Sequence, residues 1–218
     1  MLKSKKHVFW EAFFITVVIF LMGLLIGVAI EASRLNDINE FYAQSEISLL
    51  DIFTFNDLLK LGKINCEIIA EENIKFADRI YDEARLLSKY SSSEKITELS
   101  KSVHKKYDLM RTLLWINAIE AKDKCSSQPI TVVYLYELET EDLAQKATQN
   151  VWSKILLELK EKKGNAILLI PISVDNDIAS LRTLIEEYKI EKYPVLIIDN
   201  EDVVSELESV ENLEKYLN

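Results

Sequence analysis

Cysteine, histidine, proline and glycine are all scarce in this chain of 218 residues, which has two Cys, two His, three Pro and four Gly. Two cysteines are too few for a disulfide-rich miniprotein or a four-thiolate zinc site. The two histidines, His7 and His104, are too far apart along the chain to form a zinc site. The sequence also lacks a phosphate-binding glycine loop, a nucleophile elbow and a paired-carboxylate motif. We therefore expect no catalytic residue, no metal and no cofactor.

Positive charge is scarce as well, because 26 Lys and Arg residues face 36 Asp and Glu residues, for a net charge of −10. Binding to a nucleic-acid backbone needs clustered Lys and Arg, and no basic stripe is present, so we expect no nucleic-acid partner. The mean hydropathy is nevertheless +0.02, and 49% of the residues are hydrophobic. This average indicates an apolar segment joined to an acidic remainder.

The apolar segment covers residues 12–30, AFFITVVIFLMGLLIGVAI, and contains no charged residue. As a helix rising 1.5 Å per residue, it is about 28 Å long, enough to cross the hydrocarbon core of a bilayer. Trp10 stands at its N-terminal edge, and Lys3, Lys5 and Lys6 form the dense basic cluster beside it. The positive-inside rule then predicts a single-pass protein of the cell membrane, with a cytoplasmic N-terminus and the bulk of the chain extracytoplasmic.

A cleavable signal peptide is the alternative to this signal-anchor, because Gly27 and Ala29 are small residues at the spacing of a cleavage site. The apolar run is longer than the usual 7–15 residues of a signal peptide, which favours the anchor. Gly23 and Gly27 also form a G-x-x-x-G motif, a spacing that lets two membrane helices pack closely as a homodimer. Glycine is common in membrane helices, so the motif also occurs by chance.

Proline and glycine divide the rest of the chain. There is no proline before Pro129, and Gly62 is the one glycine between Gly27 and Gly164. Residues 31–128 therefore read as helical, with a net charge of −3, and residues 129–218 as mixed α/β, with a net charge of −9. We predict three parts: a basic tail and transmembrane helix over 1–30, a helical stalk over 31–128, and an α/β domain over 129–218.

Apolar spacing predicts three helices in the stalk: one ending near Gly62, a second over 65–90, and a third over 94–122 that follows a serine turn. The second and third should form an antiparallel hairpin. The face expected for the first helix is Ile47, Leu50, Thr54, Leu58 and Leu61. The third helix has a coiled-coil-like seam of Ile96, Leu99, Val103, Tyr107, Met110, Leu114, Asn117 and Ala121.

The third helix is also apolar on a second face, around Trp115. We expect the helix that contains Leu50 and Leu58 to pack there. Alternatively, this surface contacts another subunit.

The hairpin brings the two cysteines to one end, because Cys66 begins the second helix and Cys125 follows the third. In an oxidising compartment we expect them to form a disulfide that stabilises the hairpin. Two free thiols are the first alternative. A reactive redox pair is the second, although neither cysteine belongs to a Cys-x-x-Cys turn.

From Pro129 the predicted order is β-α-β-α-β-β-α, with elements near 130–136, 140–163, 166–173, 178–189, 195–199, 203–207 and 210–217. The stretch PISVDNDIASLRTLIEEYKIEKYPVLIIDNEDVVSELESVENLEKYL resembles the second half of the thioredoxin-like fold family. The resemblance covers residues 129–218. The fold class we predict is thus an α/β thioredoxin-like domain preceded by a transmembrane helix and an antiparallel α-helical hairpin.

The resemblance implies that Pro194 is the family's cis-proline. The turn after the first strand should contain Cys-x-x-Cys, but residues 137–142 read ELETED, so the family's redox activity is not supported. These acidic residues complement the N-terminus of the next helix, or bind a cation or a basic partner. The family's N-terminal β-α unit is missing. We therefore expect the strand over 166–173 to lie at the sheet edge, which suits Pro171, with the hairpin or a partner strand beside it.

Three functions are compatible with this sequence. The first is a membrane-anchored, extracytoplasmic, redox-inactive thioredoxin-like scaffold that binds a protein partner, whose identity the sequence does not specify. The second is an envelope thiol–disulfide oxidoreductase that uses Cys66 and Cys125. The third is a membrane assembly protein that oligomerises through its helices, including Gly23 and Gly27.

Overall fold

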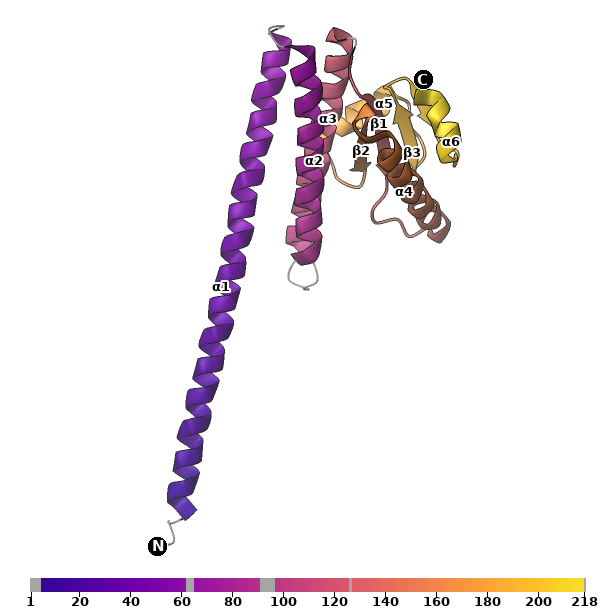
Figure 1. Ribbon diagram of the computed structural model, residues 1–218. Coiled ribbons are helices and arrows are strands. Elements are labelled where there is room, and N and C mark those ends of the chain that lie inside the picture. The colour runs from indigo at the N-terminus through magenta and orange to yellow at the C-terminus, as the bar shows by residue number, and fades with distance from the viewer. Residues whose placement is uncertain (1–4, 62–64, 91–96, 126, 218) are drawn as a thin grey trace. The chain divides into compact units, whose positions relative to one another are not determined.

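The computed structural model describes residues 5–61, 65–90, 97–125 and 127–217 (Figure 1). It divides into two compact units, Met1–Asp51 and Ile52–Asn218, whereas the sequence suggests boundaries near residues 30 and 128. The predicted helix end at Gly62 and the predicted serine turn lie outside the described residues.

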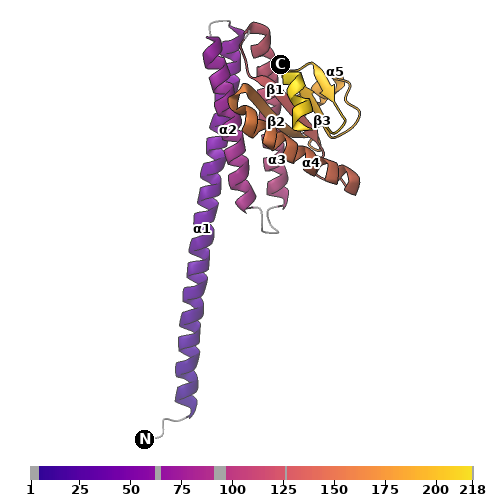
Figure 2. The same ribbon diagram turned by 45° about the vertical axis from the view of Figure 1, so that its right-hand side comes forward.

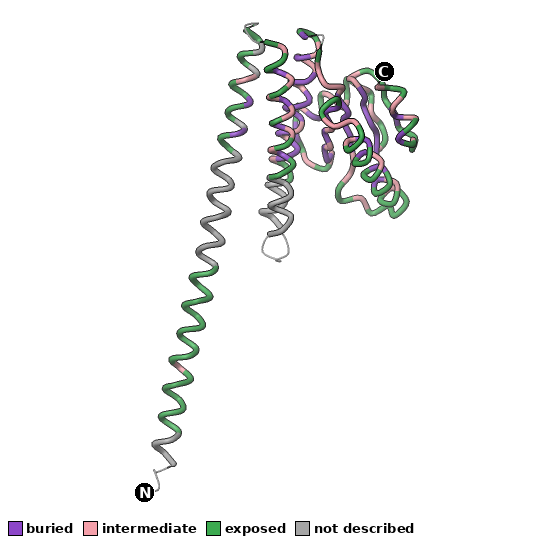
Figure 3. Tube along the Cα trace, viewed as in Figure 1, coloured by how far each residue is buried: buried purple, intermediate pink, exposed green. Residues whose placement is uncertain are grey.

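The first unit consists of the larger part of helix α1 (Lys5–Lys60). Its segment Phe9–Ile30 has 22 residues, a mean hydropathy of 2.9 and side chains exposed along its length (Figure 3). This segment is long and apolar enough to cross a membrane. The helix continues to Lys60 because residues 31–60 contain no proline or glycine that would end it.

The predicted packing face of the end of α1 is wrong. All five of its residues are exposed, including Leu50 and Leu58, whereas Ile52 is only 2% exposed. Phe55 packs against a cluster that contains Ile69 and Ala121. Apolar residues occur all around this part of the helix, so their spacing alone fits more than one face.

Helices α2 (Cys66–Tyr90) and α3 (Thr97–Lys124) lie side by side as an antiparallel hairpin, as predicted (Figures 1 and 2). Their facing side chains are buried at alternating spacings of three and four residues. On α2 these are Ile69, Asn73, Phe76 and Ile80, and on α3 they are Tyr107, Met110, Leu114, Asn117 and Ala121. The seam side chains of Ile96, Leu99 and Val103 lie outside the described residues.

The rest of the second unit is an α/β arrangement around a mixed sheet of strands in the order β2-β1-β3-β4. Strands β1 (Ile130–Tyr136) and β2 (Ile167–Ser173) are parallel, and β3 (Val195–Ile198) is antiparallel to both β1 and β4 (Asp202–Val204). Strand β2 lies at the sheet edge, as expected, with Pro171 opposite Tyr134.

Helices cover both faces of the sheet (Figure 2). On one face, α4 (Leu143–Lys163) and α6 (Val210–Leu213, extended by the turn Glu214–Leu217) pack on alternate strand residues. This core contains Val132, Tyr134, Trp152, Leu156, Leu159, Leu196, Ile198 and Leu213. On the other face, α3 packs beside α5 (Ala179–Glu187).

The apolar face of α3 around Trp115 therefore packs on the sheet side of the unit, and Leu58 at the end of α1, which was expected there, is exposed. The Trp115 Nε1 donates to Asn200 Oδ1 at 2.9 Å, and its ring stacks on Tyr188 with centroids 5.3 Å apart. An ion pair joins the C-terminal end of α3 to the β3–β4 turn, with Lys122 Nζ 2.8 Å from Asp199 Oδ2. The hairpin and the sheet consequently form one compact unit.

Candidate functional site

The turn between β1 and α4 is where the thioredoxin resemblance would put a redox motif. Here Asp142 caps α4, with its carboxylate accepting from the backbone N–H of Ala144 at 2.8 Å and of Gln145 at 3.3 Å. The Gln149 side chain holds the start of the turn with two hydrogen bonds of 2.9 Å. Its Oε1 accepts from the Glu137 backbone N–H, and its Nε2 donates to the Glu137 carbonyl. At least part of this acidic cluster is therefore used to begin the helix.

Pro194 lies beside this turn. The Tyr193–Pro194 peptide bond is cis, and Pro194 is buried immediately before β3. Burial raises the pKa of the Tyr193 hydroxyl, and the nearby Glu137 carboxylate raises it further. The fold thus brings the turn and the cis-proline together, but residues 137–142 supply no thiol or imidazole to act as a nucleophile.

The predicted disulfide between Cys66 and Cys125 is confirmed, with a sulfur–sulfur distance of 2.01 Å and Cα atoms 5.6 Å apart. Cys125 is 5% exposed and packs with Ile69 and Ala121. The Cys66 carbonyl accepts from the Gln128 amide at 3.1 Å. Both cysteines of the chain are therefore oxidised, which contradicts the free-thiol alternative.

Gly23 and Gly27 lie within the apolar segment of α1. Apart from the adjoining residues and the backbone of its own helix, a Cβ atom added at either position would meet no atom within 4 Å. Each glycine thus has open space beside it on α1.

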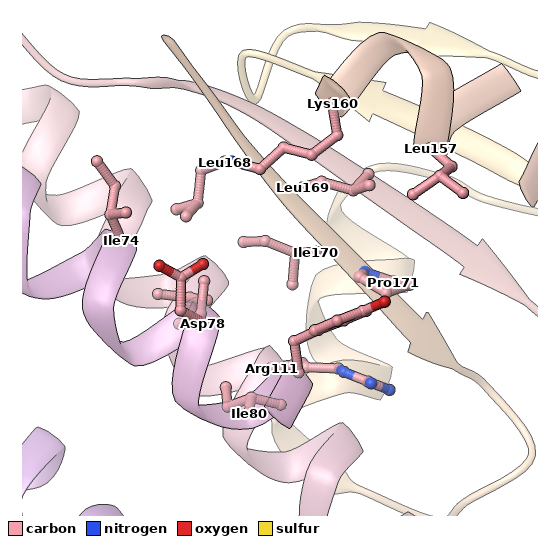
Figure 4. A pocket seen from close by; sticks show the side chains of 13 residues that line it. Ile74, Asp78, Ile80, Arg111, Leu157, Lys160, Leu168, Leu169, Ile170 and Pro171 are labelled. Carbon is pink, nitrogen blue, oxygen red and sulfur yellow. The ribbon is translucent and has the colours of Figure 1, made fainter. Parts of the chain in front are cut away.

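A feature that the sequence did not predict is a groove beside β2. One cavity of about 340 Å³ lies between α2, α3, α4 and β2 (Figure 4), and a second of about 430 Å³ lies along α4, β1 and β2. The cavities share four lining residues, so we treat them as one feature, the β2 groove. The shared residues are Tyr81, Leu157, Leu169 and Pro171.

One wall of the β2 groove is a single face of α4. Lys146, Asn150, Ser153, Leu157 and Lys160 recur there at intervals of three and four residues. From sequence this pattern is indistinguishable from the boundary face of any amphipathic helix, so periodicity gave no signal for a groove. Only the position of α2 across from this face makes it concave.

Charged groups stand at the sides of the β2 groove. Lys160 reaches from α4 toward α2, and the Asp78 carboxylate points into the same space (Figure 4). The Lys160 Nζ donates to the carbonyls of Gly164 and Ile167, both at 2.9 Å. Burial lowers the pKa of this ammonium, which Asp78 partly offsets. Arg111 lines the groove from α3.

The described residues contain no group of three or more His, Cys, Asp or Glu side chains that could hold a metal ion. Comparison of the chain with protein-family models gives no match. A search of curated proteins also gives none. The site therefore has to be interpreted from its own geometry.

Proposed function

We propose that this chain is a single-pass membrane protein with a cytoplasmic N-terminus, whose extracytoplasmic part is a redox-inactive, thioredoxin-like binding and scaffold domain. The observation that carries the binding function is the β2 groove, which combines an apolar lining with a few charged groups at its sides. Sites of this kind are typical of ligand binding. In this proposal the helices also scaffold a protein partner.

A thioredoxin-like identity is supported by three features of the α/β part. The strand order is β2-β1-β3-β4 with parallel β1 and β2, and a cis Pro194 precedes β3 beside the turn that begins α4. In addition, α3 precedes β1 and packs beside α5, so the hairpin supplies the helix ahead of the first strand.

The absence of redox activity is supported by the two sites where it could reside. The turn at 137–142 has no thiol, and Cys66 and Cys125 are bonded to each other with Cys125 buried. In an insulin-reduction assay with the full chain in detergent, we expect no turnover above that of a Cys66→Ser/Cys125→Ser control. Turnover that the wild type shows and this control lacks would replace the binding function with a thiol–disulfide oxidoreductase.

The membrane topology is tested with added cysteines. Leu143 is 81% exposed at the start of α4, so Leu143→Cys should react with a membrane-impermeant maleimide in intact cells. Ser4→Cys, in the basic tail, should react only after the cells are permeabilised. The reverse pattern, or release of the chain from the membrane by high-salt washing, would contradict the proposed anchor.

A further inference from the structure

The row of hydrogen-bonding groups at the edge of β2 that borders the β2 groove is interrupted at three positions, Ile167, Pro171 and Ser173. Val174 N donates to the Tyr136 carbonyl on β1, whereas Ser173 N donates away from the sheet, to Asp108 Oδ1 at 3.1 Å. Because strand residues alternate, the odd positions 167 to 173 point away from β1. The carbonyl of Ile167 is already occupied by Lys160, and Pro171 has no N–H.

This edge is therefore poorly suited to pairing with a strand of a partner, which needs a row of free backbone donors and acceptors. Helix α2 also lies along β2 and limits the space beside it. An occupant of the groove must be slender and need few hydrogen bonds. A linear alkyl chain meets both conditions.

The lining fits such a chain. Around the middle of the groove it is apolar, and its larger members are Ile74, Ile80, Leu114, Leu157, Leu168 and Ile170. Each cavity has a volume within the range of about 300–1,000 Å³ that is usual for small-molecule sites. Burial of methylene groups there removes apolar surface from water and so favours binding.

The charges of the groove favour an anionic head group. Residues 129–218 have a net charge of −9, yet Lys146 and Lys160 both line the groove from α4, while Arg111 on α3 is paired with Asp108. The α4 wall of the groove therefore carries two lysines and no carboxylate, although the domain is acidic. The Lys160 ammonium lies at the apolar cavity, where an anion gains most from a nearby cation.

We propose that the β2 groove binds the alkyl chain of an anionic amphiphile, with its carboxylate or phosphate head group beside Lys160. This rests on the binding function proposed above and names the chemical class of its ligand. A free fatty acid and a lysophospholipid share this chemistry. Asp78, on the opposite side, opposes the head group and weakens the binding.

The test uses the full chain in lipid nanodiscs and a twelve-carbon fatty acid that carries a photoreactive diazirine near its methyl end. We expect saturable labelling that mass spectrometry maps to α2, α4 and β2. Leu157→Glu should reduce it about tenfold, because it puts a charge into the apolar groove. Leu143→Glu, an exposed leucine of the same helix outside the groove, should leave it within about twofold.

Asp78→Asn should strengthen labelling about threefold, because it removes the charge that repels the head group. A photoreactive dodecanol, which has no charge, should label about fivefold less than the fatty acid. Displacement by unlabelled dodecanoate or by lysophosphatidylglycerol supports the proposal, and the stronger competitor identifies the source of the chain. An intact disulfide and an unchanged circular dichroism spectrum verify that each variant folds.

Labelling that is unsaturable, that maps elsewhere or that Leu157→Glu leaves unchanged would overturn the assignment. Equal labelling by the alcohol would overturn the anionic head group. Displacement by an added apolar peptide but by neither amphiphile would also overturn it, in favour of a peptide site. These outcomes are separate from failure of the proposed function, which would show as disulfide turnover or inverted maleimide labelling.

Discussion

Asp108 is a buried carboxylate of α3 that joins the hairpin to the end of β2. Its oxygens accept from Ser173 N at 3.1 Å and from Asn176 Nδ2 at 2.8 Å, and Arg111 Nη1 lies 3.5 Å away. All three neighbours are hydrogen-bond donors. Both oxygens therefore have to accept, and a carboxyl group keeps acceptor capacity on both of them whether it is protonated or ionised, unlike an amide.

Asp108→Asn tests this requirement. The amide keeps the shape of the side chain but turns one of its two acceptor positions into a donor that faces other donors. We expect the free energy of unfolding to fall by about 1–3 kcal/mol, measured by chemical denaturation of the full chain in detergent. Asp123→Asn, at an exposed position of the same helix, should change it by less than about 0.5 kcal/mol. Equal effects of the two variants would contradict this role.

Burial raises the pKa of Asp108, and its hydrogen bonds and Arg111 oppose the rise only in part. At a pH above 3.8, the ordinary pKa of this group, the Asp108 carboxyl then keeps its proton more readily in the folded state than in the unfolded state. The stability that comes from Asp108 is therefore present at low pH and is lost as the pH rises through the folded pKa. The stability difference between wild type and Asp108→Asn should shrink as the pH rises above the ordinary pKa of 3.8. A difference that grows with pH would mean that the pKa is lowered.

At the scale of the elements, the hairpin seam contains a buried polar layer. Ile69 packs with Ala121, and one turn further along the antiparallel helices are Asn73 and Asn117. Asn117 is fully buried, and neither atom of its amide group has a hydrogen-bond partner among the described residues. Buried asparagines in helical seams fix the register of the helices at a cost in stability.

Asn117→Leu should remove that cost. Because the leucine buries apolar atoms and leaves no amide unpaired, we expect the free energy of unfolding to rise by about 1–2 kcal/mol, measured by thermal or chemical denaturation. Asn150→Leu, at an exposed position of α4, is the control and should have little effect. A marked loss of stability in Asn117→Leu would indicate that the native amide is hydrogen-bonded.

A bulky substitution at Gly27 tests the predicted homodimer, which depends on close packing at Gly23 and Gly27. A Cβ atom at position 27 meets no other side chain within 4 Å, so Gly27→Ile should leave the fold intact while blocking close approach of a second α1. We expect the cross-linked dimer in membranes to fall about fivefold, which corresponds to about 1 kcal/mol. Ala29→Ile adds bulk on another face of the helix and should leave the dimer unchanged. Unchanged cross-linking in Gly27→Ile would exclude this interface.

At the scale of the whole molecule, the disulfide closes a loop between residues 59 positions apart and holds one end of the hairpin. Cys66→Ser/Cys125→Ser should lower the free energy of unfolding by about 2–4 kcal/mol, since the open chain has more conformational entropy when unfolded. Denaturation with and without dithiothreitol measures this. The reductant should destabilise the wild type alone, and an effect on the double variant would point to another cause.

The sequence was most informative about elements whose pattern is local. The helices α2 and α3, the strand order along the chain and the apolar segment of α1 all follow from spacing and from where proline and glycine occur. The disulfide follows from the same spacing. The edge position of β2 was instead expected from the resemblance to the thioredoxin-like family. The packing face at the end of α1 could not be predicted from spacing, because apolar residues occur on all sides of this part of the helix.

What the sequence by itself determined is thus the list of elements, a segment able to cross a membrane and a hairpin that brings Cys66 and Cys125 to one end. Each of these depends on residues near one another along the chain or on a simple hairpin. Only the tertiary structure decided that α3 belongs to the sheet through Asp108 and Trp115, and that α2 and α4 enclose the β2 groove. Burial and concavity arise where distant segments meet, so no local periodicity encodes them.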